Sequence, residues 1–203
     1  MSPLRLLAAL LLIGNLAACS LLPKSQALSI YRLPASSLPT HTVSADWALR
    51  VNTPYSSQLL DSTRIAVLPP GDQISAYQGV RWSDRAPLLL RDRLIDAFLD
   101  DGRLQAVSSD ESRLQADLAL DGDLRAFHSE YQNGRPAARI QFDARLVESG
   151  SLRILASRRF EVSQVASDTS VPAVVDAFGK AGDQLAREVL EWTLSQGNAA
   201  QAQ

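Results

Sequence analysis

The sequence predicts an α+β fold of two layers, in which two amphipathic helices cover one face of a mixed, largely antiparallel sheet. The first half of the chain holds short apolar runs that stop at Pro or Gly, and the second half holds three consecutive segments in which apolar and polar residues alternate. Two further stretches repeat apolar residues every three or four positions. Alternation is typical of half-buried strands, and the longer period is typical of helices that bury one side.

Four apolar runs in the first half are candidate strands, at residues 28–33, 47–51, 64–68 and 73–78. Pro34 ends the first run, which we interpret as an edge strand because Pro cannot donate to a ladder. Pro69-Pro70-Gly71 ends the third run. Residues 34–44 are rich in Pro, Ser and Thr, and we expect an ordered crossing or a loop there.

The first helix is predicted to begin after a cap at Ser83 or Asp84, with Pro87 in its first turn, and to end at Gly102. Its apolar face consists of Leu88, Leu90, Leu94, Ile95, Phe98 and Leu99. Its opposite, solvent-facing side consists of Asp92, Arg93 and Asp96. Leu89 falls on that polar side, so it is either an ordinary exposed leucine or a candidate partner contact.

Three alternating segments, at residues 117–127, 138–147 and 152–162, are the clearest strands of the chain. In the middle segment, Ile140, Phe142, Ala144 and Leu146 alternate with Arg139, Gln141, Asp143 and Arg145. Turn residues separate the segments at Gln132-Asn133-Gly134 and Glu148-Ser149-Gly150. We therefore expect an antiparallel meander with one face toward solvent.

A second helix is predicted after a cap at Thr169 or Ser170, with Pro172 in its first turn. One apolar stripe runs along it: Val174, Phe178, Ala181, Leu185, Val189 and Trp192. This stripe is predicted to lie on the sheet. The single folded domain is therefore expected to span residues 28–195, and residues 196–203, rich in Gln and Ala, are expected to be a flexible tail.

The N-terminus has the build of an export signal. Arg5 precedes an apolar run over residues 6–16, and Leu16-Ala17-Ala18-Cys19 ends it with small residues before the only cysteine of the chain. This tetrapeptide resembles a bacterial lipobox, which implies that residues 1–18 are a signal peptide and that Cys19 is acylated with diacylglycerol and a third chain such as palmitate. The alternative is an ordinary secretory signal with an incidental cysteine, although a lone exported thiol has no disulfide partner.

The lipobox also implies a location. Ser20 stands where an Asp would favour retention in the inner membrane of a Gram-negative bacterium. The sorting rule therefore favours the periplasmic face of the outer membrane, with the periplasmic face of the inner membrane as the alternative. Residues 19–27 are expected to be a lipidated tether, in which the eight residues after Cys19 reach at most about 26 Å.

Composition and motifs give little support for catalysis, metal binding or nucleic-acid binding. The formal net charge of the 203 residues is −2, and the basic residues are scattered among acids, so a nucleic-acid partner is not indicated. His41 and His128 stand outside any metal-ligand spacing, and the chain lacks a nucleophile elbow or a phosphate-binding glycine loop. Asp117, Asp121 and Asp123 are interpreted as a solvated strand face rather than as paired catalysts. We predict no catalytic residue, no metal site and no cofactor.

Two aromatic residues flank the start of the first helix. Tyr77 and Trp82 are candidates either for a partner surface or for core and rim packing.

Several fragments in order resemble one known family, the ABC-type transport auxiliary lipoproteins, which include the lipoprotein component of the Pqi system associated with MCE lipid-transport proteins. In the first half, the fragments are Ile30-Tyr31-Arg32-Leu33-Pro34, Thr53-Pro54-Tyr55-Ser56-Ser57-Gln58-Leu59-Leu60-Asp61, Arg64-Ile65-Ala66-Val67 and Trp82-Ser83-Asp84-Arg85-Ala86-Pro87. In the second half, they are Leu124-Arg125-Ala126-Phe127, Glu130-Tyr131, Ala144-Arg145-Leu146-Val147, Ser157-Arg158-Arg159-Phe160, Ala177-Phe178 and Glu191-Trp192. The resemblance extends over residues 29–194, almost the whole mature chain.

The resemblance implies a domain similar to the N-terminal domain of TolB, placed in the periplasm beside an ABC permease and ATPase and an MCE substrate-binding protein. Such systems move phospholipids or other hydrophobic molecules between the two membranes, and the Pqi relative implies a homo-oligomeric ring. The family offers no catalytic motif, so only Cys19 carries over as a functional residue. The expected role is a docking or scaffold subunit. The alternatives are a domain that itself carries lipid between sheet and helices and, less favoured, a periplasmic hydrolase.

Overall fold

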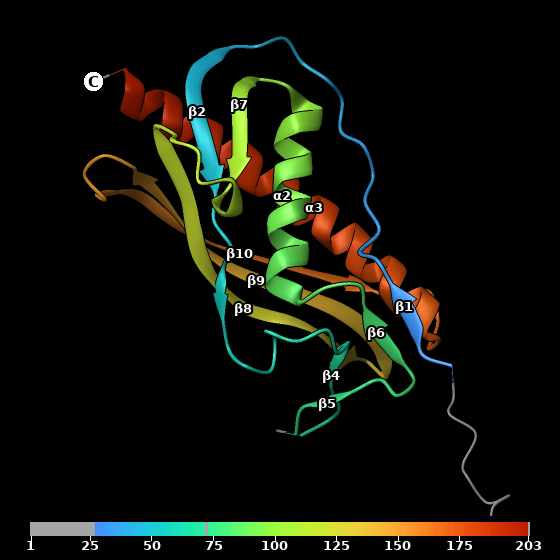
Figure 1. The fold of residues 1–203 in the computed structure, drawn as a ribbon. Coiled ribbons are helices and arrows are strands. Elements are labelled where there is room, and N and C mark those ends of the chain that lie inside the picture. Colours follow the sequence, from blue (N-terminus) through green and yellow to red (C-terminus); the bar gives the residue numbers. More distant parts are fainter. Residues whose placement is uncertain (1–26, 72, 203) are drawn as a thin grey trace, which may run out of the picture.

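A computed structural model of the protein describes residues 27–71 and 73–202. Within these residues the chain forms an eight-stranded mixed sheet, a separate two-stranded ribbon and two long helices (Figure 1). The predicted α+β class, with two helices and a mixed sheet, is confirmed. The predicted signal peptide, Cys19 and the tether up to residue 26 lie outside the described residues.

The antiparallel meander consists of β8 (Leu118–Gln132), β9 (Arg135–Glu148) and β10 (Ile154–Val165). It has the predicted order, and Ile140, Phe142, Ala144 and Leu146 of the middle strand are buried. β8 extends five residues beyond its predicted end, because β9 pairs with it as far as Gln132 opposite Arg135. The meander is therefore the longest and most regular part of the sheet.

Short strands from the first half line up along the free edge of β8. β2 (Ala45–Val51), β3 (Tyr55–Ser56) and β4 (Ala66–Leu68) each pair with it in parallel, one after another. β5 (Ser75–Ala76) forms a small hairpin with β4, and β7 (Leu104–Ser109) adds a parallel edge strand to β2. The 3-10 turn η2 (Asp110–Ser112) follows β7. β3 and β7 were not predicted, because neither has a clear alternation of apolar and polar residues.

The separate ribbon pairs β1 (Ser29–Tyr31) in parallel with β6 (Val80–Trp82). β1 lies inside the predicted edge strand, whereas β6 was not predicted. The ribbon lies at the end of the molecule where β4 and β5 also lie (Figure 1). From β1 the chain crosses to β2 through residues 32–44, the ordered crossing that the sequence suggested.

The first helix is α2 (Ala86–Asp101). Its N-cap is Arg85 rather than Ser83 or Asp84, and Arg85 has no side-chain capping bond. The predicted stop is present: Gly102 has a φ of 76°, and its N–H donates to the Phe98 carbonyl. Two expectations for its faces were wrong. Leu99 is exposed rather than buried, and Arg93 is buried rather than facing solvent.

The second helix is α3 (Val171–Gln201), and Ser170 caps it by accepting a hydrogen bond from the Ala173 N–H. Residues 196–201, expected as a flexible tail, are helical. The reason is a contact with β2: Trp47 Nε1 donates to Asn198 Oδ1 at 2.9 Å. Gly197 lets the Trp47 ring approach closely, since a Cβ there would lie 2.3 Å from the ring.

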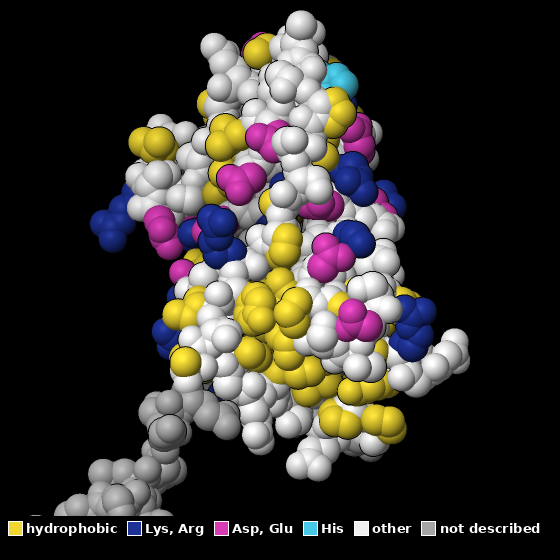
Figure 2. Space-filling view, turned by 90° about the vertical axis from the view of Figure 1, so that its right-hand side faces the viewer, with side chains coloured by type: hydrophobic (Ala, Val, Ile, Leu, Met, Phe, Trp, Pro, Cys, Tyr) yellow, Lys and Arg dark blue, Asp and Glu magenta, His cyan; other side chains and the backbone are white. Residues whose placement is uncertain are grey.

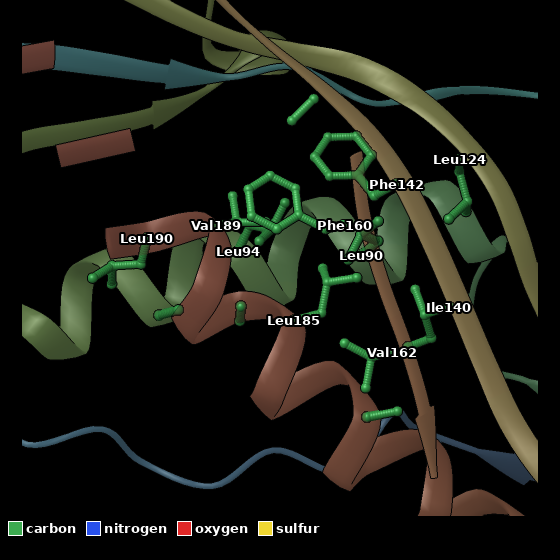
Figure 3. Packing of buried hydrophobic residues seen from close by; sticks show 14 of the residues in the cluster. Leu90, Leu94, Leu124, Ile140, Phe142, Phe160, Val162, Leu185, Val189 and Leu190 are labelled. Atoms are coloured by element: carbon green, nitrogen blue, oxygen red, sulfur yellow. The ribbon is translucent and has the colours of Figure 1, made fainter. Parts of the chain in front are cut away.

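The core lies between the helices and the sheet. Leu90 and Leu94 of α2 and Leu185 and Val189 of α3 point toward Phe142, Phe160, Ile140 and Val162 of β9 and β10 (Figure 3). All six residues of the predicted α3 stripe are buried. None of the described helices is long and apolar enough to cross a membrane.

Candidate functional site

In the described part of the chain, the two histidines lie apart and belong to no cluster of metal-ligating side chains. His41 lies in the exposed crossing, with Nε2 3.7 Å from Asp101 Oδ2, and His128 lies on β8, with Nε2 3.8 Å from Glu130 Oε2. Burial lowers the pKa of His128, although Glu130 opposes this. Among residues 27–71 and 73–202, no three His, Cys, Asp or Glu residues are grouped to hold a metal ion. Among the described residues, each histidine has one carboxylate within 4 Å.

The carboxylates of the meander are held by arginines on the outer face of the sheet. Arg145 bonds Asp123 at 2.6 Å and Asp121 at 3.3 Å. Asp143 accepts from Arg159 at 2.8 Å, and the Arg159 guanidinium holds the pKa of Asp143 below its usual range. This cross-strand network gives these acids a structural role on the face that was predicted to be solvated.

Asp117 lies directly before the first residue of β8. Its carboxylate accepts the Ala48 N–H at 2.7 Å and so joins the meander to β2.

The crossing segment is fastened to both helices by a buried ion pair. Arg93 of α2 contacts Asp183 of α3 at 2.7 Å, and their side chains are 2% and 9% exposed. The Asp183 carboxylate also accepts the Ser36 N–H at 3.1 Å, while Arg93 donates to the Ser36 carbonyl at 3.1 Å. We call Arg93, Asp183 and Ser36 the clasp. It fixes the crossing, α2 and α3 to one another, and Arg93 was assigned to the wrong face because its partner is 90 residues away.

A small groove lies between the crossing and α2, beside the clasp. It has a volume of about 160 Å³ and is lined by Arg32, Leu33, Ala35, Ser83, Leu89, Asp92, Arg93 and Asp96. Leu89 is half-buried in this groove, and burial together with its acidic neighbours Asp92 and Asp100 raises the pKa of Asp96. Figure 2 shows apolar side chains gathered in the lower half of the face on which β1 and the crossing lie. Leu89 therefore lies half-buried in the wall of the groove, and its role as a partner contact stays a prediction.

The two candidate aromatics occupy different environments. Trp82 is 1% exposed and makes edge contacts with Phe127 and Phe178, at centroid distances of 5.9 and 5.3 Å. It is a core residue and offers no surface to a partner, because its strand turns the ring inward. Tyr77 is half-buried, and its hydroxyl donates to Ser129 Oγ at 3.2 Å. Burial raises the pKa of Tyr77, so it is a neutral residue at the rim of the sheet.

One family profile and several similar proteins match this chain. The profile of the ABC-type transport auxiliary lipoprotein component matches residues 31–190. A crystal structure of a Xanthomonas campestris protein assigned to DUF330 is similar at 33% identity and a TM-score of 0.81, covering 86% of this chain and 99% of that one. A second crystal structure, of an uncharacterized protein, shares the fold at 15% identity and a TM-score of 0.64, covering 81% and 97%.

A curated relative is longer than this chain. An uncharacterized protein of Bradyrhizobium diazoefficiens is 30% identical over 147 residues, which are 72% of this chain and 39% of that protein. The chain thus spans well under half the length of this relative.

Proposed function

Because this chain belongs to the family of ABC-type transport auxiliary lipoprotein components, we propose that it is the docking subunit of an ABC/MCE-type transport system. The family is one of transport auxiliary lipoproteins and not of enzymes, and it implies a lipid-anchored periplasmic protein of a Gram-negative bacterium. The proposed cargo is phospholipid or another hydrophobic molecule that moves between the inner and outer membranes. The observation that carries the proposal is the family match over residues 31–190, which cover nearly all of the described fold.

The proposed mechanism is positional. Acyl chains on Cys19 hold the domain at the periplasmic face of the outer membrane, since several chains anchor much more firmly than one. The eight residues after Cys19 reach at most about 26 Å, so the domain stays next to that membrane. A rigid domain on a short tether keeps its partner-binding surface within a limited distance of the membrane.

Partner contact is assigned to the groove around Leu89 and to the rim at Tyr77. The clasp supports this assignment because it holds the crossing rigidly beside α2, which makes the groove a preformed surface. The proposed partners of the protein are an MCE substrate-binding protein, the ABC permease and ATPase, and further copies of this chain in a ring. Catalysis forms no part of the proposed role.

Docking is better supported than lipid carriage by the domain itself. The space between α3 and the meander is filled by Phe142 and Phe160, each 1% exposed, and Trp192 packs on Phe160 at a centroid distance of 5.6 Å. A buried acyl chain would have to displace these rings from a close-packed core.

Crosslinking and affinity purification from cells test the docking role. The wild-type protein is expected to recover the MCE protein and the permease. Leu89→Glu adds a third negative charge beside Asp92 and Asp96 and is expected to reduce this recovery severalfold. The matched control is Leu152→Glu, because Leu152 is 75% exposed in the distant β9–β10 turn. Recovery of no transport component with the wild type would contradict the proposal.

A separate variant tests the anchor. Cys19→Ala is expected to release or mislocalise the protein, as measured by membrane fractionation. Unchanged fractionation with the outer membrane would remove the acyl anchor from the mechanism.

A further inference from the structure

One face of the β1–β6 ribbon points away from the core and carries apolar side chains. Side chains alternate along a strand, so residues 28, 30 and 32 share a face, while Tyr31 between them is half-buried against the core. Leu28 is 49% exposed and Ile30 is 55% exposed. The register partner of Ile30 is Arg81 on β6, which is also exposed. We call Leu28, Ile30, Arg32 and Arg81 the ribbon face.

The arginines of the ribbon face differ from those of the meander. Arg32 and Arg81 have no ion pair with any described residue, whereas Arg145 and Arg159 are bound by carboxylates. Thr63 is joined to the ribbon, since its carbonyl accepts the Trp82 N–H at 2.7 Å. The next residue, Arg64, is also exposed and has no ion pair with a described residue. Free guanidinium groups therefore accompany exposed aliphatic side chains at this end of the molecule.

A neighbouring hollow has the same chemistry. It has a volume of about 330 Å³ and is lined by Leu59, Arg64, Ala66, Ile74, Ser75 and Ala76. Leu59 and Ile74 are 39% and 40% exposed, so the mixture of aliphatic and basic groups continues from the ribbon onto the β4–β5 hairpin.

We propose that the ribbon face rests on the phospholipid surface of the membrane that holds the anchor. Leu28 and Ile30 insert at the boundary of headgroups and acyl chains, while Arg32 and Arg81 bind lipid phosphates through their guanidinium forks. The inference rests on the proposed acylation of Cys19, which places a bilayer within about 26 Å of residue 27, next to Leu28. Because the tether already holds the domain at the bilayer, the ribbon face meets the lipid surface at a high effective concentration. Weak contacts are then enough to keep it bound there. The charge complementarity between free arginines and phosphates selects lipid over an apolar protein partner.

The test uses the full lipidated protein in vesicles of phosphatidylethanolamine with phosphatidylglycerol. A nitroxide is attached through Ile30→Cys, with Leu152→Cys at the far end of the molecule as the matched control. Mass spectrometry first establishes acylation of Cys19. The Ile30 label is then expected to be severalfold more accessible to oxygen and less accessible to a water-soluble nickel chelate than the Leu152 label.

Charge variants test the phosphate contact. Arg81→Gln is expected to lower the ratio of docked to undocked protein about fivefold, from the ~1 kcal/mol that a basic side chain contributes near an anionic surface. Arg187→Gln on α3 is the matched control, since Arg187 is exposed and lacks an ion pair with the described residues. Arg32→Gln provides a second variant if Arg81→Gln changes the circular dichroism spectrum.

The outcomes separate this inference from the anchor. A protein without acyl chains overturns both. An acylated protein whose Ile30 label is as water-accessible as the Leu152 label overturns the membrane contact and leaves the anchor intact. A label that is protected in cells and exposed in the vesicles assigns the ribbon face to a protein partner and also overturns the proposal.

Discussion

The two helices are held against the rest of the molecule by different forces. α3 lies on β9 and β10 with one apolar stripe, from Val174 to Trp192, and its single buried charge, Asp183, contacts α2 in the clasp. α2 packs on α3 and β7 and buries two arginines, Arg91 and Arg93, beside its leucines. Arg93 belongs to the clasp, and Arg91 reaches Asp110 and Glu111 of η2, which follows β7. The apolar stripe of α3 can be predicted from its own residues, whereas the buried arginines of α2 depend on partners that are distant in sequence.

Breaking the clasp is expected to have the largest effect. Arg93→Met leaves the Asp183 carboxylate buried without its counter-ion and should lower the free energy of unfolding by about 4 kcal/mol, as measured by urea denaturation. The double variant Arg93→Met/Asp183→Leu removes both charges and is expected to recover most of the loss. A small effect of the single variant would show that α2 does not depend on its buried charge.

Shortening one side chain of the α3 stripe tests how much this apolar stripe contributes to stability. Leu185 is fully buried, so Leu185→Ala should lower the free energy of unfolding by about 3 kcal/mol, through lost transfer energy and the cavity left behind. The exposed control Arg187→Ala, on the same helix, is expected to change it little. Equal losses for the two variants would contradict the role of the stripe.

The end of α3 offers a smaller effect. Gly197→Ala places a methyl group against the Trp47 ring and should lower the free energy of unfolding by about 2 kcal/mol, through overpacking. Tryptophan fluorescence and denaturation measure the change. If residues 196–201 were loose in solution, the substitution would instead be neutral or slightly favourable, because alanine favours helix.

The smallest effect concerns pH and the second buried arginine. Burial tends to raise the pKa of Asp110, but hydrogen bonds from Thr53 and Arg91 outweigh it and lower the pKa below its usual value. The unfolded chain therefore takes up this proton first, so the contribution of Asp110 is present above about pH 4 and is lost as the pH falls through the lower folded pKa. Denaturation at pH 3 and pH 6 should show a smaller pH dependence in Asp110→Asn than in the wild type. An unchanged pH dependence would mean that the bonds from Thr53 and Arg91 to Asp110 are not formed in solution.

The sequence predicted elements whose apolar pattern repeats over many residues. It did not predict the position of a single side chain that depends on tertiary contacts. The alternation around Phe142 and the period through Leu185 each span many residues, so occasional exceptions do not hide them. Trp82 in the candidate site has no such support. Its neighbours resemble a loop before a helix, and the pairing of β6 with β1 turns its ring into the core. The groove at Leu89 was predicted only in part. A leucine on a polar helix face can be recognised in the sequence, but the position of the crossing, which forms the other wall, cannot.

The sequence by itself determined the fold class, the meander, the stop at Gly102 and the stripe of α3, because these follow from local periods and from backbone preferences of single residues. Tertiary structure decided the parallel addition of β2, β3 and β4 to β8, the inward turn of Trp82, the clasp and the last turns of α3. The clasp joins residues 90 positions apart, and the Trp47 contact with Asn198 joins residues 151 positions apart. Such pairs form only when distant segments share one core, and buried charges and close glycine contacts leave no periodic trace in the sequence.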